Sequence, residues 1–371
     1  MPLRFTLFLL VIVISACSSN KPSNETPFIN PTVKQADEPT GILKRRVVLL
    51  GDAGHSAIEP LQASLQVAVE QAQLSPEQTS VVMLGDNIYY FGFPEKEDGQ
   101  QDYTDDQLED ISHLEAQLQI AKRSGAEIFV VPGNHDWYAE QVDSQAAYIS
   151  NYANSHNIKA SFVPHQLGQA PHPEIIHRAG ISIVFLDSMW LIKAQEDQYQ
   201  NAMNHLHDLL TEASQQHPDN IILVTAHHPI ETMGPHNRYY TSSAYKTMIA
   251  AYELFAENDQ DTDHPRYQRL IDGMELTLSR FDKVIYAAGH DHSLQIFKDS
   301  QDKAPQYRIV SGAANTSKIS GVGTNENTQF ALAHEGLMVL DVYDNGAVLK
   351  VFAINQAEPV HQQWLWRSKA Q

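Results

Sequence analysis

Short polar motifs follow directly after apolar runs at five places in this chain of 371 residues. In sequence order they are Gly51-Asp52-Ala53-Gly54, Gly85-Asp86-Asn87-Ile88-Tyr89, Gly133-Asn134-His135-Asp136, His227-His228-Pro229 and Gly289-His290-Asp291-His292. One Gly-Asp or Gly-Asn pair marks an ordinary turn. Five motifs in order, each closing a strand candidate, indicate instead that Asp, Asn, His and Tyr side chains gather at one sheet edge, as donors for a pair of metal ions.

Short apolar runs alternate with longer amphipathic stretches through most of the chain. The strand candidates are residues 47–50, 81–84, 128–131, 181–186, 221–225 and 284–288, and helix candidates lie at 60–73, 105–124, 203–216 and 267–279. This alternation is typical of an α/β fold, in which the loops that follow the strands share one edge.

The C-terminal part has a different pattern. Residues 309–311, 336–342 and 347–354 are strand candidates, and Asp344-Asn345-Gly346 predicts a tight hairpin turn between the last two. We predict that these strands form a second mixed sheet, packed face to face on the first and flanked by helices. Two polar, turn-rich segments, 91–106 and 237–264, are either lids over the motifs or solvated surface insertions.

The composition narrows the classes of function. The chain has a formal net charge of −20 and is 42% hydrophobic, so it can bury one large core or two modest ones. The acidic balance argues against a nucleic-acid scaffold, because such proteins neutralise phosphates with Lys and Arg. An anionic substrate would therefore need its negative charge neutralised within the binding site, and bound metal cations can do this.

The N-terminus has the features of a targeting segment. Arg4 precedes an apolar run at 7–14 that is too short to span a bilayer, and Ile14-Ser15-Ala16-Cys17 resembles a bacterial lipobox. Cys17 is the only cysteine, so it is either the acylated residue or an ordinary buried or free thiol, and we predict acylation. Ser18 after the cysteine favours, by resemblance, the outer membrane.

The resulting domain plan has three parts. We expect a lipoprotein signal peptide at 1–16, a flexible tether rich in polar residues at 17–41 and a single domain at 42–371. The expected location is the periplasm, with a lipid anchor in the membrane.

The motif set resembles the calcineurin-like metallophosphoesterase superfamily and, within it, the purple acid phosphatases. The resemblance runs from about residue 47 to residue 354. Most members have a histidine two residues after the first Asp, where this chain has Gly54. Purple acid phosphatases share that glycine and supply a tyrosine three residues after the second Asp, where this chain has Tyr89. The resemblance implies a four-layer fold of two β-sheets between helices.

The resemblance also implies a ligand set for two metal ions. One ion would be held by Asp52, Asp86, Tyr89 and His292, and the other by Asp86, Asn134, His227 and His290. A phenolate is a hard donor, so Tyr89 favours Fe(III) at the first site, whereas Asn and His suit divalent Fe, Zn or Mn at the second. The alternative for Tyr89 is a packed aromatic ring beside Tyr90 and Phe91.

Other residues are candidates for contact with substrate. His135, which the family places beside the metals, is the first candidate for the acid that protonates the leaving group, and His236 is the second. Asn134 and His228 are candidate substrate contacts, and Asp136 and Asp291 are expected to orient their neighbours.

The expected function is hydrolysis of small phosphomonoesters by a metal-activated hydroxide, without a covalent enzyme intermediate. A phosphodiesterase or nucleotide hydrolase would use the same residues. A binding lipoprotein that retains the fold without turnover is the alternative of another class.

Overall fold

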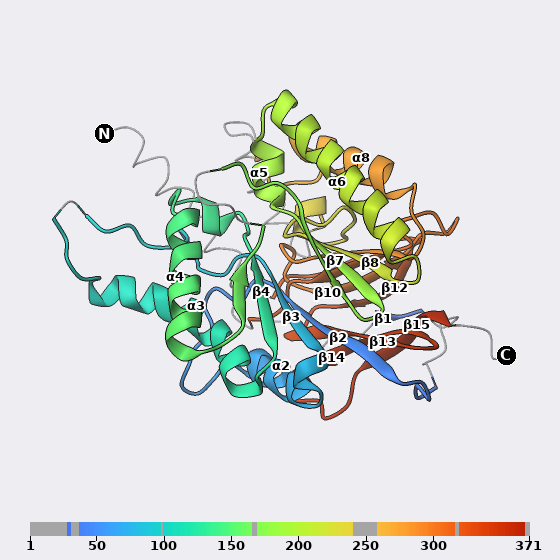
Figure 1. The fold of residues 1–371 in the computed structure, drawn as a ribbon, viewed down its shortest axis with the longest axis horizontal. Helices are drawn as coiled ribbons and strands as arrows, with labels where there is room; N and C mark the ends of the chain where they lie inside the picture. Colours follow the sequence, from blue (N-terminus) through green and yellow to red (C-terminus); the bar gives the residue numbers. More distant parts are fainter. Residues whose placement is uncertain are drawn as a thin grey trace.

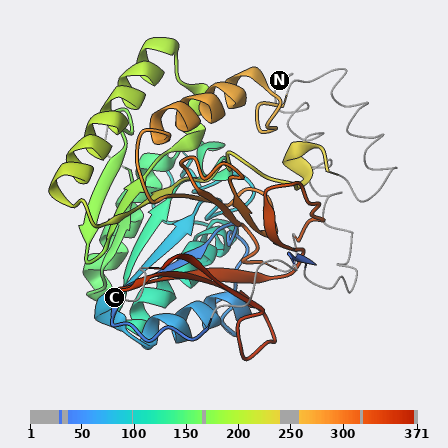
Figure 2. The same ribbon diagram turned by 90° about the vertical axis from the view of Figure 1, so that its right-hand side faces the viewer.

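The computed structural model describes residues 28–30, 37–97, 99–164, 169–239, 258–315 and 319–367. Their strands form one sheet of eight strands and one of seven, and helices lie on the outer side of each sheet (Figures 1 and 2). Cys17, the predicted signal peptide and most of the predicted tether lie outside the described residues. Among the residues that are described, no helix is long and apolar enough to cross a membrane.

The seven-stranded sheet has the order β15-β14-β13-β2-β3-β4-β5. Its parallel strands are β2 (Leu43–Leu50), β3 (Thr79–Leu84), β4 (Glu127–Val131) and β5 (Ala160–Phe162). Its antiparallel strands are β13 (Gly336–Tyr343), β14 (Gly346–Ala353) and β15 (His361–Arg367). All six residues of β3 are buried, because both faces of the sheet are covered.

The eight-stranded sheet has the order β1-β12-β10-β11-β9-β8-β7-β6. Its strands are β1 (Phe28–Ile29), β6 (Glu174–Arg178), β7 (Ile181–Phe185), β8 (Ile221–Thr225), β9 (Val284–Ala288), β10 (Leu294–Lys298), β11 (Tyr307–Ser311) and β12 (Thr328–Leu332). Strands β7, β8, β9 and β11 run parallel, and β6, β10, β12 and β1 add antiparallel pairs at the two sides. The predicted strands 221–225 and 284–288 coincide with β8 and β9.

The prediction of two mixed sheets packed face to face and flanked by helices is confirmed, but the expected division of strands between them is wrong. The C-terminal hairpin β13–β14 does form, with Tyr343 paired to Gly346 across the turn. It joins the sheet of the earliest strands, however, because β13 pairs antiparallel with β2. Strands β7–β9, predicted as part of the first sheet, belong to the other one. Local periodicity identifies a strand but carries no information about its distant pairing partner.

Helices complete the outer layers. Helices α2 (Ala63–Gln73), α3 (Asp105–Ser124) and α4 (Val142–His156) pack on the seven-stranded sheet, and α5 (Ser188–Lys193), α6 (Glu196–Gln216) and α8 (Pro265–Leu278) pack on the eight-stranded sheet. Figures 1 and 2 both show α6 and α8 side by side. Helix α3 matches its predicted bounds because Thr104 and Gln107 form a capping box at its start and Gly125, with φ of 80°, ends it.

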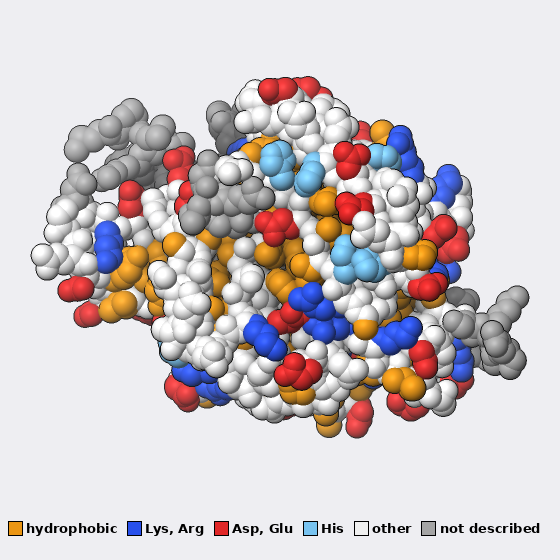
Figure 3. All heavy atoms as spheres, in the orientation of Figure 1, with side chains coloured by type: hydrophobic (Ala, Val, Ile, Leu, Met, Phe, Trp, Pro, Cys, Tyr) orange, Lys and Arg blue, Asp and Glu red, His pale blue; other side chains and the backbone are white. Residues whose placement is uncertain are grey.

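The core between the sheets positions the motifs. Apolar side chains of both sheets form one buried cluster, which includes Leu49, Leu84 and Leu223. The carboxyl ends of β2, β3 and β4 therefore lie next to those of β8 and β9, so the loops that carry the motifs meet there. On the face that Figure 3 shows, acidic and basic side chains are interspersed rather than gathered by sign.

Candidate metal centre

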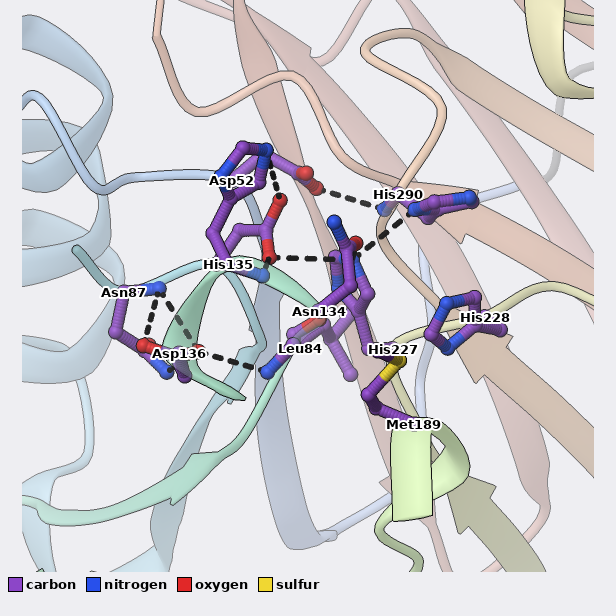
Figure 4. Close-up of polar contacts among 12 residues, drawn as sticks. Asp52, Leu84, Asn87, Asn134, His135, Asp136, Met189, His227, His228 and His290 are labelled. Carbon is purple, nitrogen blue, oxygen red and sulfur yellow. Dashed lines mark hydrogen bonds and ion pairs between the residues drawn. The ribbon is translucent and has the colours of Figure 1, made fainter. Parts of the chain in front are cut away.

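The structure brings together all seven side chains predicted to bind metal. They come from the loops after β2, β3, β4, β8 and β9, and are Asp52, Asp86, Tyr89, Asn134, His227, His290 and His292. All are buried or nearly so, with His292 the most accessible at 20% side-chain exposure. Figure 4 shows the side chains of Asp52, Asn134, His227 and His290 converging on one space.

Three donor atoms form the first donor group: Asp52 Oδ1, Tyr89 OH and His292 Nε2. The hydroxyl lies 3.1 Å from the Asp52 oxygen and 3.3 Å from the His292 nitrogen, and the remaining pair is 3.2 Å apart. Metal bonds to N and O of about 2.0–2.2 Å, at 90–110° to one another, place neighbouring donors about 3.0–3.5 Å apart. The first donor group has this spacing.

The second donor group comprises Asn134 Oδ1, His227 Nε2 and His290 Nδ1. His227 Nε2 lies 2.9 Å from the Asn134 oxygen and 3.2 Å from His290 Nδ1. Asp86 Oδ1 is 3.4 Å from the same His227 nitrogen. Ligand atoms of Asp52, Asp86 and His227 all lie within 4.8 Å of one another, as do those of His227, His228 and His290. The two donor groups are therefore neighbours.

Asp86 lies between the two donor groups. It is close enough to His227 for ion pairing and interacts with the Tyr89 hydroxyl. Its Oδ1 also accepts a hydrogen bond of 2.9 Å from the backbone N–H of His135. Because a carboxylate has two oxygens, this position allows one side chain to serve both groups.

Three of these residues have left-handed backbone conformations. The φ angles are 63° at Asp52, 55° at Asp86 and 70° at His290. Non-glycine residues rarely adopt this region, although Asp and His tolerate it better than most. Such conformations cluster at functional sites, where they aim side chains that an extended strand would point elsewhere.

Gly54 lies against the backbone of the loop that carries Tyr89. A Cβ at Gly54 would lie 2.8 Å from both the carbonyl oxygen of Asp86 and the backbone nitrogen of Tyr89. No side chain fits there, so the loop after β2 cannot carry a histidine at this position. The close approach is held by a 3.2 Å hydrogen bond from the Tyr89 N–H to the Gly54 carbonyl. Gly54 and Tyr89, the two positions that set this chain apart from most of the family, therefore lie on loops in direct backbone contact.

Backbone carbonyls fix the orientation of two histidines. His227 Nδ1 lies 2.8 Å from the Leu84 carbonyl oxygen, and His290 Nε2 lies 3.0 Å from the Gln260 carbonyl oxygen. Each imidazole therefore donates its proton to a carbonyl and turns its other nitrogen toward the second donor group. Burial, followed by the neighbouring His236 and His228, lowers the pKa of His290 well below its usual value, so its ring is neutral. Metal ligation requires a neutral ring.

Gln260 is a supporting residue that no sequence motif marks. It is buried, and its side-chain oxygen lies 2.8 Å from His228 Nε2. Its side-chain nitrogen donates to Asp259 at 2.8 Å and contacts the Met189 sulfur at 3.5 Å. These side-chain contacts hold the Gln260 backbone in place, and the carbonyl of that residue orients His290. Gln260 lies in the polar segment 237–264, where no motif marks it.

His228, predicted to contact substrate, is fully buried. Its Nδ1 lies 2.8 Å from Ser188 Oγ and its Nε2 is engaged by Gln260. Burial, with a smaller effect from His227, lowers the pKa of His228 to about 3. Figure 4 shows His228 farther from Asp52 than His227 is. In this arrangement the ring supports Gln260 and has no open side toward substrate.

The two candidate acids lie on different sides of the centre. His135 Nδ1 is 2.7 Å from the Tyr90 carbonyl oxygen, and its Nε2 is 3.8 Å from Asp86 Oδ2. His236 stacks on His290 with ring centroids 3.8 Å apart, and its Nδ1 is 3.0 Å from Asp261 Oδ1. Burial lowers the pKa of His236, but the Asp261 hydrogen bond and nearby carboxylates outweigh it and raise the pKa to about 9.

Asp136 and Asp291 organise the loops. Asp136 accepts hydrogen bonds from the backbone N–H groups of Gly133 and Asn87 and from the side chains of Asn87 and Gln145. It thereby joins the loops after β3 and β4 (Figure 4). Asp291 accepts hydrogen bonds from the Thr232 hydroxyl and, at 3.3 Å, from the His236 N–H. Neither carboxylate belongs to a donor group.

Comparisons with known proteins agree with this geometry. Residues 45–294 match the family model described as calcineurin-like phosphoesterase. GAP50, the anchor in the inner membrane complex of Plasmodium, is similar in structure, with a TM-score of 0.52, 18% identity, and 89% of this chain and 90% of that chain covered. Purple acid phosphatase PPD1 from yellow lupin seeds has a TM-score of 0.54 and 14% identity over 89% of this chain and 55% of that one. At these identities the likeness is one of fold.

Comparison of the sequence with curated proteins gives no match. The family model, by contrast, covers more than half of the chain. The match ends just after the last of the five motifs, at the first residue of β10. It therefore spans every residue of the two donor groups. This chain belongs to the calcineurin-like phosphoesterase family.

Proposed function

We propose that this protein hydrolyses phosphomonoesters with two metal ions that share Asp86. The observation that carries the proposal is the pair of donor groups, with separations of 3.1–3.3 Å in one and 2.9–3.2 Å in the other. Asp52, Tyr89 and His292 would hold the first ion, and Asn134, His227 and His290 the second. Dinuclear centres are a property of the family, and the donor chemistry here fits one.

The donor types suggest which ions bind. A phenolate and a carboxylate favour a hard trivalent ion, so we assign Fe(III) to the first donor group. The amide oxygen and two imidazoles of the second suit divalent Fe, Zn or Mn. When bound, two such ions lower the pKa of water, orient the phosphate and offset the charge that grows during in-line displacement.

The chain's own residues would handle the leaving group. His135 Nδ1 is engaged by the Tyr90 carbonyl, and Nε2, 3.8 Å from Asp86 Oδ2, is the ring nitrogen that would hold or release a proton toward the centre. We assign His135 as the acid that protonates the leaving oxygen, with His236 as the second candidate. Asn134 is the candidate substrate contact, because its Nδ2 faces outward to the Tyr138 hydroxyl at 2.8 Å while its Oδ1 faces the donor group.

A substrate panel tests this proposal. Metal-loaded protein is assayed for phosphate release from phenyl phosphate, glycerol 2-phosphate, bis(p-nitrophenyl) phosphate and ATP. We expect monoesters to be favoured, with His135→Ala retaining metal and losing rate mainly for poor leaving groups. Preferred cleavage of the diester or of ATP would support a diesterase or nucleotide hydrolase. Bound metal without turnover of any ester would support a binding lipoprotein.

We further propose that the protein is a periplasmic lipoprotein, held in the outer membrane through an acylated Cys17. The lipobox-like quartet 14–17 and the polar stretch after it support this address. Cys17→Ser should release the protein from the membrane fraction, while Ser18→Ala serves as a matched control. Mass spectrometry of the native N-terminus without an acyl group would contradict the proposal.

A further inference from the structure

Strand β1 fixes the place at which the N-terminal segment joins the domain. It pairs antiparallel with β12, with Phe28 opposite Ala331, and the N–H of Asn30 donates a 3.2 Å hydrogen bond to the Gln329 carbonyl. Figure 1 shows β1 beside β12, at the end of the eight-stranded sheet. In this position β1 covers what would otherwise be an open edge of the sheet.

The register places Phe28 at the end of the sheet that carries the metal centre. Ala331, which is opposite Phe28, is also opposite Gln295 in β10. Gln295 follows the proposed ligand His292 by three residues. Neighbouring strands lie about 4.8 Å apart, so the backbone of Phe28 is about 10 Å from that of Gln295. Because β1 and β10 are both antiparallel to β12, β1 runs away from the metal-centre end and its first residue lies at that end.

The next strand along the chain begins at the opposite end. β2 starts at Leu43, and the chain reaches the metal centre only at Asp52, beyond the carboxyl end of that strand. A chain that joined the domain first at β2 would therefore enter it on the side away from the centre. Leu43 is 26 residues after Cys17, whereas Phe28 is 11 residues after it. At about 3.3–3.6 Å per residue, docking of β1 shortens the longest possible reach from about 90 Å to about 40 Å.

Exposed aromatic side chains also gather at the metal-centre end. Among the described residues, four aromatic side chains are 37–47% exposed: Phe28, Phe91, Tyr138 and Tyr239. The last three lie two to four residues after Tyr89, Asn134 and His236, which belong to the centre or border it. The exposed large apolar residues at the opposite end are aliphatic, namely Ile42, Leu74 and Leu276. Single exposed apolar residues are ordinary, but aromatic side chains with a polar tip favour the interface between membrane and water.

We propose that the metal-centre end of this domain faces the membrane that holds the lipid anchor. In this arrangement β1 sets the orientation, and the four exposed aromatic side chains contact the lipid surface. The inference rests on the proposed acylation of Cys17 and is independent of phosphatase turnover. The short reach limits the distance to the membrane, whereas the point at which the chain joins the domain and the position of the aromatic side chains both select the same end.

Energy transfer to labelled lipid measures the orientation. Cys17 is the only cysteine of the chain, so in acylated protein an added cysteine is the only free thiol. A donor dye is attached to the Asp143→Cys variant, exposed in the first turn of α4 at the metal-centre end, or to the Leu74→Cys variant at the opposite end. Each protein is reconstituted into vesicles of phosphatidylethanolamine and phosphatidylglycerol that contain acceptor lipid. Transfer should be greater from Asp143→Cys, because the eight residues of β2 alone separate the two ends by about 26 Å.

A matched pair of variants tests the role of β1. Asn30→Pro removes the N–H that donates to the Gln329 carbonyl, so it should reduce the difference in transfer between the two dye positions. Asn30→Ala keeps this N–H and should keep the difference. Far-UV circular dichroism of each variant checks that the domain is folded.

A second pair tests the exposed aromatic side chains. Phe91→Ser/Tyr239→Ser should lower the transfer from the dye on Asp143→Cys, because two lipid contacts are lost. Ile42→Ser/Leu276→Ser removes two apolar side chains that are 74% and 65% exposed at the opposite end, and it should leave the transfer unchanged.

The outcomes separate this inference from the proposals around it. In acylated protein, equal transfer from the two dye positions, or greater transfer from Leu74→Cys, would overturn the inference. Wild-type transfer in Asn30→Pro or in Phe91→Ser/Tyr239→Ser would also overturn it. Native protein without an acyl group would refute the anchor and the inference with it. An acylated and oriented protein that cleaves no phosphoester would leave the inference standing and refute only the proposed phosphatase function.

Discussion

Replacing Tyr89 by Phe removes one oxygen from the centre and keeps the aromatic ring. The hydroxyl lies 3.1 Å from Asp52 Oδ1 and 3.3 Å from His292 Nε2, so the substitution deletes one of three atoms in the first donor group. The ring packs edge-on against His135 and His55, with centroids 4.6 and 5.3 Å away, and these contacts remain. The variant therefore separates metal ligation from packing.

The structure sets the size of both effects. In metal-free protein, two lost hydrogen bonds lower the free energy of unfolding by about 1–3 kcal/mol. Loss of an outer partner of a metal ligand weakens metal binding about 10–100-fold. Loss of a direct ligand should exceed that range, so Tyr89→Phe should weaken the first site by more than about 100-fold. The visible absorption of a ferric phenolate should disappear with the oxygen.

The assay is titration of metal-free protein with iron, followed by visible spectroscopy and by competition with a chelator. Tyr90→Phe is the matched control, because it removes the hydroxyl of the adjacent tyrosine and should keep the absorption band. Wild-type protein that holds ferric iron but has the same spectrum and affinity as Tyr89→Phe would refute the ligand assignment. Tyr89 would then be a packing residue only.

Three further substitutions test two supports of the centre and one buried ion-pair cluster in the seven-stranded sheet. Gln260→Ala should weaken binding of the second metal ion about 10–100-fold and leave binding of the first unchanged. Chelator competition at each site measures the two affinities. Equal losses at both sites would contradict the role of the Gln260 carbonyl in orienting His290. Asp136→Asn should lower the free energy of unfolding of metal-free protein by about 1–3 kcal/mol, since an amide replaces one acceptor oxygen with a donor, and unchanged denaturant curves would contradict this. Burial raises the pKa of Asp341, but the ion pairs with Arg46 and Lys350 outweigh it, so the folded pKa is lowered. The ionised Asp341 carboxylate therefore stabilises the folded state fully above the unfolded pKa of about 3.9, and this stabilisation is lost as pH falls through the lower pKa of the folded state. Asp341→Asn should therefore cost about 3 kcal/mol at pH 7 and flatten the acid limb of the stability curve; an unchanged limb would refute this.

The sequence was sufficient to predict the strand ends that carry the motifs. Buried parallel strands are continuous apolar runs, so the pattern predicts strands at 221–225 and 284–288, the bounds that β8 and β9 have in the structure. The polar residues that follow these strands are expected at one edge of the sheet, because the carboxyl ends of parallel strands meet at that edge. The link between Gly54 and Tyr89 was visible as a paired departure from the family pattern. The structure adds that the two loops are in backbone contact at Gly54, which leaves no room for a side chain there.

Other features depend on contacts that sequence distance conceals. The pairing of β13 with β2 joins Met338 to Leu49, and no local pattern encodes that register. The burial of His228 follows from Ser188, the first residue of α5, and from Gln260, in the segment before α8. Helix α6 begins at Glu196 rather than 203 because Gln195 and Gln198 cap it, a weaker signal than Ser or Thr. The sequence predicts which side chains gather at the centre, but it does not predict the residues that hold them in place.

The central claim is that two metal ions bind in the loops at the carboxyl ends of β2, β3, β4, β8 and β9 and share Asp86. Metal content per chain, measured by elemental analysis and native mass spectrometry on wild type and Asp86→Ala, tests it most directly. We expect two ions per chain in the wild type, one of them iron, and weakened binding at both sites in the variant. A wild type that holds a single ion, or an Asp86→Ala variant that loses one ion and retains the other at full affinity, would contradict it.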